Sequence, residues 1–282
     1  MSLQTTFKHG AKKRLKALRS LYHDRFKAFS PADLRSTLAG MGLAAGDILL
    51  VHSSFDAFEG YQGKPSDVLA QLQALVGQSG LLMMPTMTFS GTAVDYARAN
   101  PVVNLARVPS RMGLLTEIFR RTPGVVRSAH PTHPVAIWGA DAAVVADGHH
   151  LAATPCGAGS PFDALRKRQG KIVLLGTDIA VLTYYHLLEE LLEHELPVRV
   201  FTEEVFTLRA KVADGAELQW QGRLFDPAVS RRRNLHKIVP GLKQAGAWRE
   251  AQVGGLKIVV LAAADVEREV RSMCARGVHC YG

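Results

Sequence analysis

Four short, almost wholly apolar runs divide this chain, and segments with helical signals separate them. The runs are DILLVHSS (47–54), GLLMMPTMTF (80–89), IVLLGTD (172–178) and LKIVVLAAADV (256–266). Runs of this length are typical of strands buried on both faces, and strands that alternate with helices predict an α/β fold built in layers. Each run is shorter than the roughly 18 residues of a membrane-spanning helix, so we expect no membrane span.

The segments between the runs indicate where the helices begin. Ser30 and Pro31 open a predicted helix over 30–42, because serine caps a helix and proline suits its first position. Three further helices are expected over 67–76, 109–121 and 160–171. A loop that leads into a strand is expected over 127–139.

From residue 198 onwards, apolar and polar residues alternate, as they do in a β-hairpin. The hairpin makes the predicted sheet a mixed one. We find no repeat, low-complexity tract or linker, and therefore expect one domain over 1–282 with a C-terminal β-rich subregion over 198–255.

The chain carries an excess of positive charge. The formal net charge is +9, which favours anionic partners: nucleic acid, an acidic membrane or a cofactor that bears phosphate. Many of the cations lie in a predicted amphipathic basic helix over 8–27, within an N-terminal extension, 1–29. We interpret it as a terminal helix docked on the body, with nucleic-acid or membrane binding as alternatives. The three cysteines form no disulfide framework, which favours a reducing cytoplasm.

Polar residues cluster where the predicted strands end. His52, Ser53 and Ser54 close the first run, and Thr177 and Asp178 close the third. Ligands of open α/β sheets collect outside the carboxyl ends of the strands. We therefore expect a binding site at this edge, close to the segment LTYYHLLEE (182–190), which carries His186 and Glu189.

Two other chemistries fit this edge poorly. A metal site would use His186, Glu190 and His194, but their spacing is not that of a zinc-binding helix, so we expect no metal. A serine hydrolase would use Ser53 or Ser54, but VHSSF lacks the small residues of a nucleophile elbow.

Six segments together resemble the aminoglycoside 3-N-acetyltransferase family. They are GDILLVHSSF (46–55), GLLMMPTMTF (80–89), PSRMGLLTEIFRR (109–121), RSAHPTHPVAIWG (127–139), GSPFDAL (159–165) and GKIVLLGTD…TYYHLLEE (170–190). The resemblance implies a three-layer α/β/α fold with a mixed sheet. It also implies acetyl transfer from acetyl-CoA to the amine of an amino sugar, with no nucleic-acid partner. A monomer or homodimer is expected.

The resemblance assigns roles to residues. The family motif T-x-x-H-x-x-E falls on Thr183, His186 and Glu189, and implies that the histidine is the general base. Imidazole is basic enough to take a proton from an amine near neutral pH. A carboxylate would orient the ring, with Asp226 as the first candidate and Glu189 as the second. Coenzyme A is expected along two segments: His52, Ser53 and Ser54, and the turn Ser110, Arg111, Met112 and Gly113.

The acceptor is the least constrained part of the prediction. Residues 198–255 are expected on the acceptor side, and Thr183, Asp178 and Glu59 are its candidate ligands. The family pattern is not complete, since Leu182 stands where an asparagine is common and Pro134 where a serine is common. The charge of +9 favours an amino sugar that is neutral or attached to a nucleotide or glycan, with the polycationic aminoglycosides close behind. Acids such as Glu59, Asp95, Glu203 and Glu204 could still line a cleft for a polycation. The competing interpretation is a catalytically silent basic protein that binds nucleic acid or acidic membrane.

Overall fold

The structure is a computed structural model, and it describes residues 27–281. The basic helix expected over 8–27 therefore falls almost entirely outside the described residues. Within 27–281, no helix is both long enough and apolar enough to cross a membrane.

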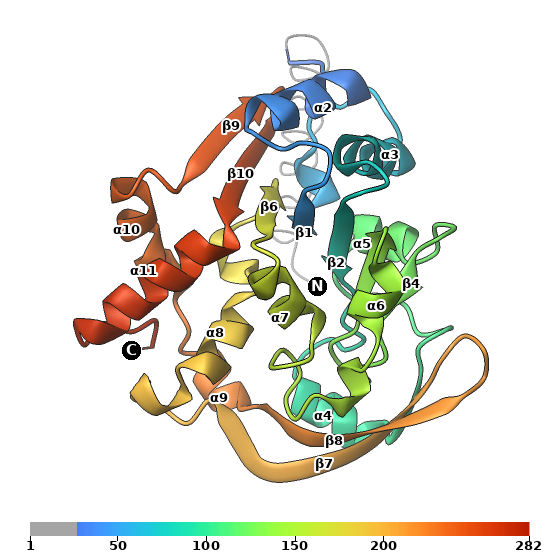
Figure 1. Ribbon diagram of the computed structural model, residues 1–282, viewed down its shortest axis with the longest axis vertical. Coiled ribbons are helices and arrows are strands. Elements are labelled where there is room, and N and C mark those ends of the chain that lie inside the picture. Colours follow the sequence, from blue (N-terminus) through green and yellow to red (C-terminus); the bar gives the residue numbers. More distant parts are fainter. Residues whose placement is uncertain (1–26, 282) are drawn as a thin grey trace, which may run out of the picture.

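Strands and helices alternate along the described chain, as the apolar runs predicted (Figure 1). The strands are β1 (Ile48–Ser53), β2 (Leu81–Pro85), β3 (Val102–Asn104), β4 (Val126–Arg127), β5 (Val135–Gly139), β6 (Lys171–Leu175), β7 (Phe201–Lys211), β8 (Glu217–Phe225), β9 (Arg249–Val253) and β10 (Leu256–Ala262). The α-helices are α2 (Pro31–Gly40), α3 (Pro65–Val76), α4 (Ala93–Ala99), α5 (Leu114–Phe119), α6 (Ala142–Ala146), α7 (Pro161–Lys167), α8 (Tyr185–Leu191), α9 (Pro227–Ser230), α10 (Val239–Gln244) and α11 (Ala263–Ala275).

The main sheet has seven strands in the order β4-β5-β2-β1-β6-β10-β9. Strands β2, β1 and β6 at its centre are parallel, and β5 and β10 run antiparallel beside them. The sheet is therefore mixed, as expected, but β5 and β10 make it so. The hairpin that was expected to make the sheet mixed, β7 and β8, belongs to a separate three-stranded sheet. Ser53 pairs with Leu175, so the carboxyl ends of β1 and β6 meet at one edge of the sheet.

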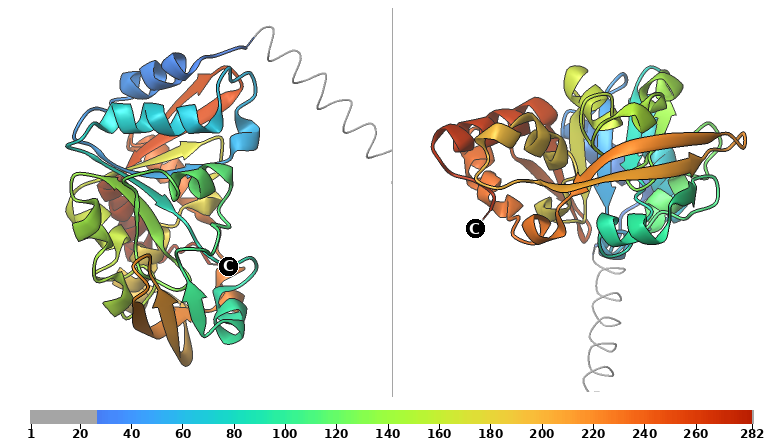
Figure 2. Two further views of the ribbon diagram at one scale, coloured as in Figure 1. Left: turned by 90° about the vertical axis from the view of Figure 1, so that its right-hand side faces the viewer. Right: turned by 90° about the horizontal axis from the view of Figure 1, so that it is seen from below.

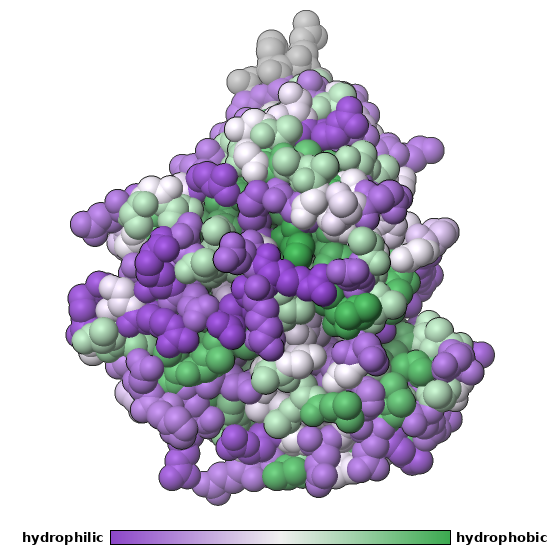
Figure 3. Space-filling model, viewed as in Figure 1, coloured by the Kyte–Doolittle hydropathy of each residue, from purple (hydrophilic) through white to green (hydrophobic). Residues whose placement is uncertain are grey.

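Two hydrophobic clusters pack against opposite faces of this sheet. One joins α2, α3 and α5 to the sheet through residues such as Leu34, Leu72 and Phe119. The other joins α7, α8 and α11 to it through Phe162, Leu188 and Val266. The predicted α/β/α layering is thus the observed one. Charged residues on α7 and α11 form ion pairs at the surface, where hydrophilic residues gather (Figure 3).

Within the β-rich subregion expected over 198–255, β7 and β8 form a long hairpin, which a short parallel strand, β3, extends. The rest of that subregion is only partly β, because residues 227–244 are mostly helical. Seen from below, the hairpin lies as an arm across the body (Figure 2). Trp220 fixes it there, since its ring is fully buried and its Nε1 donates to the carbonyl of Ala152 at 2.8 Å. The register begins at the pair Phe201–Phe225, which sets Phe225 beside the next part of the chain, α9.

Two predicted elements are shorter than expected. The helix predicted over 109–121 begins only at Leu114, because Gly113 has a φ of 112° and the amide of Arg111 donates to the carbonyl of Met87. The run over 80–89 leaves the sheet after Pro85, and its last residues bond to the loop before β5 instead.

Candidate functional site

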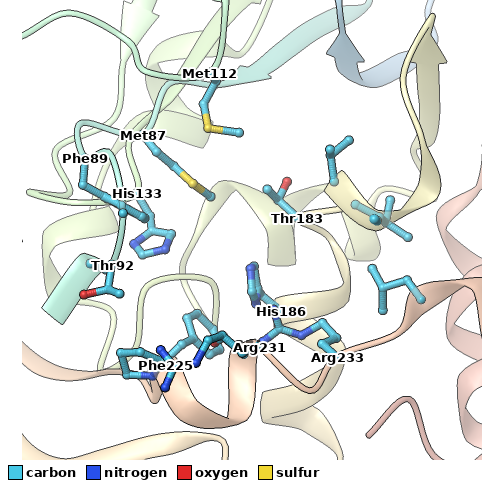
Figure 4. Close-up of a pocket in the computed structure, with 18 residues that line it drawn as sticks. Met87, Phe89, Thr92, Met112, His133, Thr183, His186, Phe225, Arg231 and Arg233 are labelled. Carbon is cyan, nitrogen blue, oxygen red and sulfur yellow. Dashed lines mark hydrogen bonds between the residues drawn. The ribbon is translucent and has the colours of Figure 1, made fainter. Parts of the chain in front are cut away.

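A cavity of about 400 Å³ opens at the edge of the sheet where β1, β2 and β6 end. His186 and Thr183 form one wall, and Met87 and Met112 face them (Figure 4). The end of the hairpin supplies Phe225, and α9 and the turn after it supply Ser230, Arg231 and Arg233. Segments far apart in sequence thus meet around His186.

Local packing brings His186 to this wall. Leu182 and Tyr185 are buried under the sheet edge, and the amides of Tyr185 and His186 donate to the carbonyls of Leu182 and Thr183. This tight turn begins α8. The side chain of His186 remains 17% exposed toward the cavity, and the ring of Phe225 packs against it with centroids 4.3 Å apart.

The ring of His186 rests on a fully buried carboxylate. Its Nδ1 lies 2.7 Å from Oε2 of Glu189, one helical turn away on α8. Glu189 has no exposed side-chain surface. A hydrogen bond from Nδ1–H to this carboxylate fixes the tautomer that has its lone pair on Nε2. Nε2 of His186 makes no hydrogen bond within residues 27–281, which leaves it available to a ligand in the cavity.

Two residues from the C-terminal part of the chain hold Glu189. Arg233 donates from Nε to Oε1 at 2.8 Å and from Nη2 to Oε2 at 3.0 Å, and the hydroxyl of Tyr281 donates to Oε1. Backbone pairing between Arg233 and Tyr281 brings the two together. A buried carboxylate is costly unless its charge is paired and its oxygens are bonded, and both conditions are met here.

These contacts set the charges of the pair. Burial raises the pKa of Glu189, but His186 and Arg233 more than offset this, so the pKa lies below its ordinary value. Burial and then the charge of Arg233 lower the pKa of His186, and Glu189 opposes them only in part. At neutral pH the site therefore contains an ionised carboxylate and a neutral imidazole, which is the protonation state of a general base.

The residues expected along coenzyme A divide into two groups. A small cavity of about 50 Å³ is lined by His52, Ser53 and Met112, and it adjoins the larger one at Met112. His52 is buried, which lowers its pKa to about 4, and its Nε2 lies 3.4 Å from the hydroxyl of Thr183. These residues are brought together as expected, beside His186.

The other expected coenzyme residues lie outside the lining of both cavities. The amide of Ser54 donates to the carbonyl of Leu175. Ser110 is buried, with its hydroxyl 2.7 Å from that of Thr116 and its amide bonded to Glu117. The turn at 110–113 is therefore held by its own hydrogen bonds, and Arg111 is exposed on it.

The first candidate for the orienting carboxylate, Asp226, needs correction. Its side chain accepts from the amide of Ala228 at 2.7 Å and caps the start of α9. The carboxylate that contacts the ring is Glu189, the second candidate. Among the expected acceptor residues, Thr183 lines the cavity, but Asp178 and Glu59 do not.

Other contacts account for those two acids. Asp178 caps a short 3-10 turn by accepting from the amide of Ala180, and it lies 3.1 Å from His236. Glu59 lies near the turn between β9 and β10, where its carbonyl accepts from Gly255. Glu190, which the metal alternative joins with His186 and His194, accepts from Thr154. Among the described residues, no cluster of three histidine, cysteine or acidic side chains is arranged to hold a metal.

Several residues of the site were not predicted from sequence. Arg233, Tyr281 and Phe225 were not among the candidate site residues. His133, which was seen only as part of a family-like segment, lines the cavity, and its ring lies 6.4 Å from that of His186. It belongs to a buried histidine cluster with His130 and His149. A basic residue or a tyrosine far along the chain carries no local pattern that marks it as a partner of Glu189.

The chain is similar to known proteins over most of its length. Aminoglycoside N(3)-acetyltransferase VII of Streptomyces paromomycinus is 33% identical over 197 residues, which cover 61% of this chain and 67% of the relative. Aminoglycoside N(3)-acetyltransferase VIII of Streptomyces fradiae is 26% identical over 82% of this chain and 86% of its own. Aminoglycoside N(3)-acetyltransferase III of Serratia marcescens is 30% identical over 55% of this chain and 62% of its own.

Solved structures have the same fold. Aminoglycoside acetyltransferase AAC(3)-Xa superposes with a TM-score of 0.78 and 26% identity over 95% of this chain and 99% of its own. AAC-IIIb in a binary complex with CoASH gives a TM-score of 0.73 at 21% identity, over 90% and 99% of the two chains. Residues 50–275 also match the family described as aminoglycoside 3-N-acetyltransferase. The resemblance drawn from six sequence segments is therefore confirmed, and the chain belongs to the aminoglycoside 3-N-acetyltransferase family, a family of acyltransferases.

Proposed function

We propose that this protein transfers an acetyl group from acetyl-CoA to the amine of an amino sugar, with His186 as the general base. The observation that carries the proposal is the pair His186–Glu189 on the cavity wall. The ring is neutral and fixed from behind, and its Nε2 is available to a ligand. Relatives named as aminoglycoside N(3)-acetyltransferases support the reaction, and a neighbouring fold in complex with CoASH supports the co-substrate.

The residues of the site suit direct transfer between two bound substrates. His186 takes a proton from the amine as the amine nitrogen forms its bond to the acetyl carbonyl carbon. The carbon–sulfur bond then breaks, and the imidazolium can return the proton to the leaving thiolate. Glu189 stabilises the imidazolium, and Arg233 and Tyr281 keep that carboxylate in place. No step requires a covalent enzyme intermediate.

Two adjoining cavities support a site for two substrates. The small cavity beside Ser53 shares Met112 and Val181 with the larger one, so a thioester arm bound along β1 would lie next to an amine beside His186. The three cysteines are free, and burial raises the pKa of the Cys156 thiol well above its ordinary range, which makes it a poor nucleophile. Free thiols also suit the reducing cytoplasm in which we place the protein.

The release of free thiol from acetyl-CoA tests the proposal. The assay compares the wild-type protein with His186→Ala across a panel of amines that includes aminoglycosides, amino sugars and amino sugars bearing phosphate. Amine-dependent thiol release that is lost in His186→Ala supports the proposal. His194→Ala is the matched control, since that histidine is exposed and lies outside the cavity. Thiol release that does not depend on any amine would point to hydrolysis instead.

A further inference from the structure

The cavity around His186 has an unusual charge for a site that acts on an aminoglycoside. Among the described residues, no aspartate or glutamate lines it, and its charged lining residues are Arg231 and Arg233. Most of the remaining wall is apolar: Met87, Phe89, Met112, Leu182, Phe225 and Leu235. A polycation that enters this cavity would lose water around its ammonium groups without gaining a counter-anion.

The nearby acids are engaged elsewhere. Glu189 lies behind the wall, and Arg233 balances its charge. The other acids form these contacts: Asp95 with Thr92, Glu204 with Arg98, Glu203 with Arg199, Asp178 with His236 and Asp226 with the amide of Ala228. The acids that would have favoured a polycation, Glu59, Asp95, Glu203 and Glu204, are thus absent from the lining of this cavity.

Arg231 is the cation that remains available. Its side chain forms no hydrogen bond or ion pair within residues 27–281, and it is exposed at the end of α9. Figure 4 shows it near Phe225 at the edge of the cavity. A guanidinium in this position can donate two parallel hydrogen bonds to a phosphate or carboxylate.

Its place in the cavity separates Arg231 from the coenzyme side. The small cavity that suits the thioester arm meets the larger one at Met112 and Val181. In Figure 4, Met112 and Arg231 lie on opposite sides of His186. An anion on Arg231 would therefore belong to the molecule that brings the amine, with the base between the two substrates.

We propose, on the basis of the acetyl transfer proposed above, that the acceptor is an amine that also carries an anionic group, and that Arg231 binds this group. The amine reaches Nε2 of His186 while the phosphate or carboxylate remains at the mouth of the cavity. Acceptors with several positive charges are poor substrates. Arg231 is in this view a residue that determines specificity.

The test compares four acceptors: glucosamine, glucosamine 6-phosphate, UDP-glucosamine and sisomicin. Wild-type kcat/KM should be roughly tenfold higher for a phosphorylated acceptor than for glucosamine, because the guanidinium of Arg231 can form charge-assisted hydrogen bonds to the phosphate. Arg231→Gln should remove most of that difference and leave KM for acetyl-CoA unchanged. Arg232→Gln is the matched control, since the neighbouring arginine is exposed but lies outside the cavity lining. Glucosamine 6-phosphate and UDP-glucosamine distinguish a sugar phosphate from a nucleoside diphosphate.

Other outcomes would contradict the inference without touching the proposed reaction. If sisomicin has the highest kcat/KM, acetyl transfer stands and the anionic acceptor is wrong. If Arg231→Gln weakens only acetyl-CoA, Arg231 belongs to the coenzyme. Calorimetric titration of the acceptors into the complex with coenzyme A gives a readout that needs no turnover. If sisomicin binds more tightly in this titration than both phosphorylated acceptors, the inference is wrong. If all four acceptors bind normally but none supports thiol release from acetyl-CoA, the result counts against the proposed reaction instead.

Discussion

His186 and His133 line the same cavity, but different groups hold their rings. Nδ1 of His186 contacts a buried carboxylate, which Arg233 and Tyr281 hold in turn. Nδ1 of His133 lies 2.8 Å from the hydroxyl of Thr132. Burial, followed by the charge of His186, lowers the pKa of His133 well below its ordinary value.

The comparison shows what allows a histidine that lines the cavity to act as a general base. Both rings are neutral at pH 7, so both could accept a proton from a ligand. The difference appears after the transfer, because an imidazolium at His186 gains the charge of Glu189, whereas one at His133 would lie among other histidines. The group behind the ring therefore matters more than exposure to the cavity.

The largest expected effect follows from removing the base. His186→Ala should lower kcat by roughly two to four orders of magnitude, the usual contribution of a positioned general base. His133→Asn should cost far less, because Asn keeps polar contacts and the base remains. Steady-state kinetics of both variants measure the contrast. Equal losses would mean that the two histidines act together, and the distinction drawn here would be wrong.

The second prediction concerns the charge that Glu189 supplies. Glu189→Gln leaves Arg233 buried without its anion, so the free energy of unfolding should fall by about 3–5 kcal/mol. The double variant Glu189→Gln, Arg233→Met removes both charges and should recover much of this stability but none of the lost turnover. Urea denaturation measures the free energy of unfolding, and steady-state kinetics measure the turnover. Full stability in Glu189→Gln alone would show that the pair is not the buried ion pair described.

The third prediction uses pH. The base must be neutral, so kcat/KM falls as pH falls through the pKa of His186. Because that pKa lies below the ordinary 6.5, half of the activity should be lost only below pH 6.5. Arg233→Met removes a charge that lowers this pKa, so the acid limb should move to higher pH. Arg233→Lys keeps the charge and should leave the limb nearly unmoved, and an unchanged limb in Arg233→Met would exclude this electrostatic role.

The smallest expected effect comes from Tyr281. Tyr281→Phe removes one hydrogen bond to Glu189 and keeps the ring packing, so kcat should fall by about tenfold or less, the range of a single hydrogen bond. KM for acetyl-CoA should not change. Tyr184→Phe is a suitable control, since that hydroxyl is buried without a partner within the described residues. A loss in Tyr281→Phe as large as that of His186→Ala would give the hydroxyl a more direct part in the reaction.

The sequence was most informative where a pattern is local. The apolar runs identified β1, β2, β6 and β10 because strands buried on both faces need continuous apolar residues. The motif at 183–189 located the pair His186–Glu189 because residues three apart share a face of a helix. The alternation of apolar and polar residues after residue 198 predicted the hairpin, because successive side chains of a strand point to opposite faces of the sheet.

The rest of the site depends on contacts that no local pattern records. Asp226 was preferred to Glu189 because it follows the hairpin, yet its carboxylate is used by the start of its own helix. Glu59 follows β1 closely in sequence but leads the chain toward the β9–β10 turn rather than the cavity. Arg233 reaches Glu189 across 44 residues and Tyr281 across 92, so only the folded chain shows them as partners.

The separation in sequence between Glu189 and its two partners also determines the order in which these contacts form during folding. The turn of helix that joins His186 to Glu189 closes locally, whereas the contacts from Arg233 and Tyr281 must close loops of 44 and 92 residues. The entropy cost of closure rises with loop length, and this cost makes non-local contacts slower to form than local ones. During refolding, helical content should therefore return before enzymatic activity does. In the intermediate population, His186 already contacts Glu189, but Arg233 and Tyr281 do not yet hold that carboxylate.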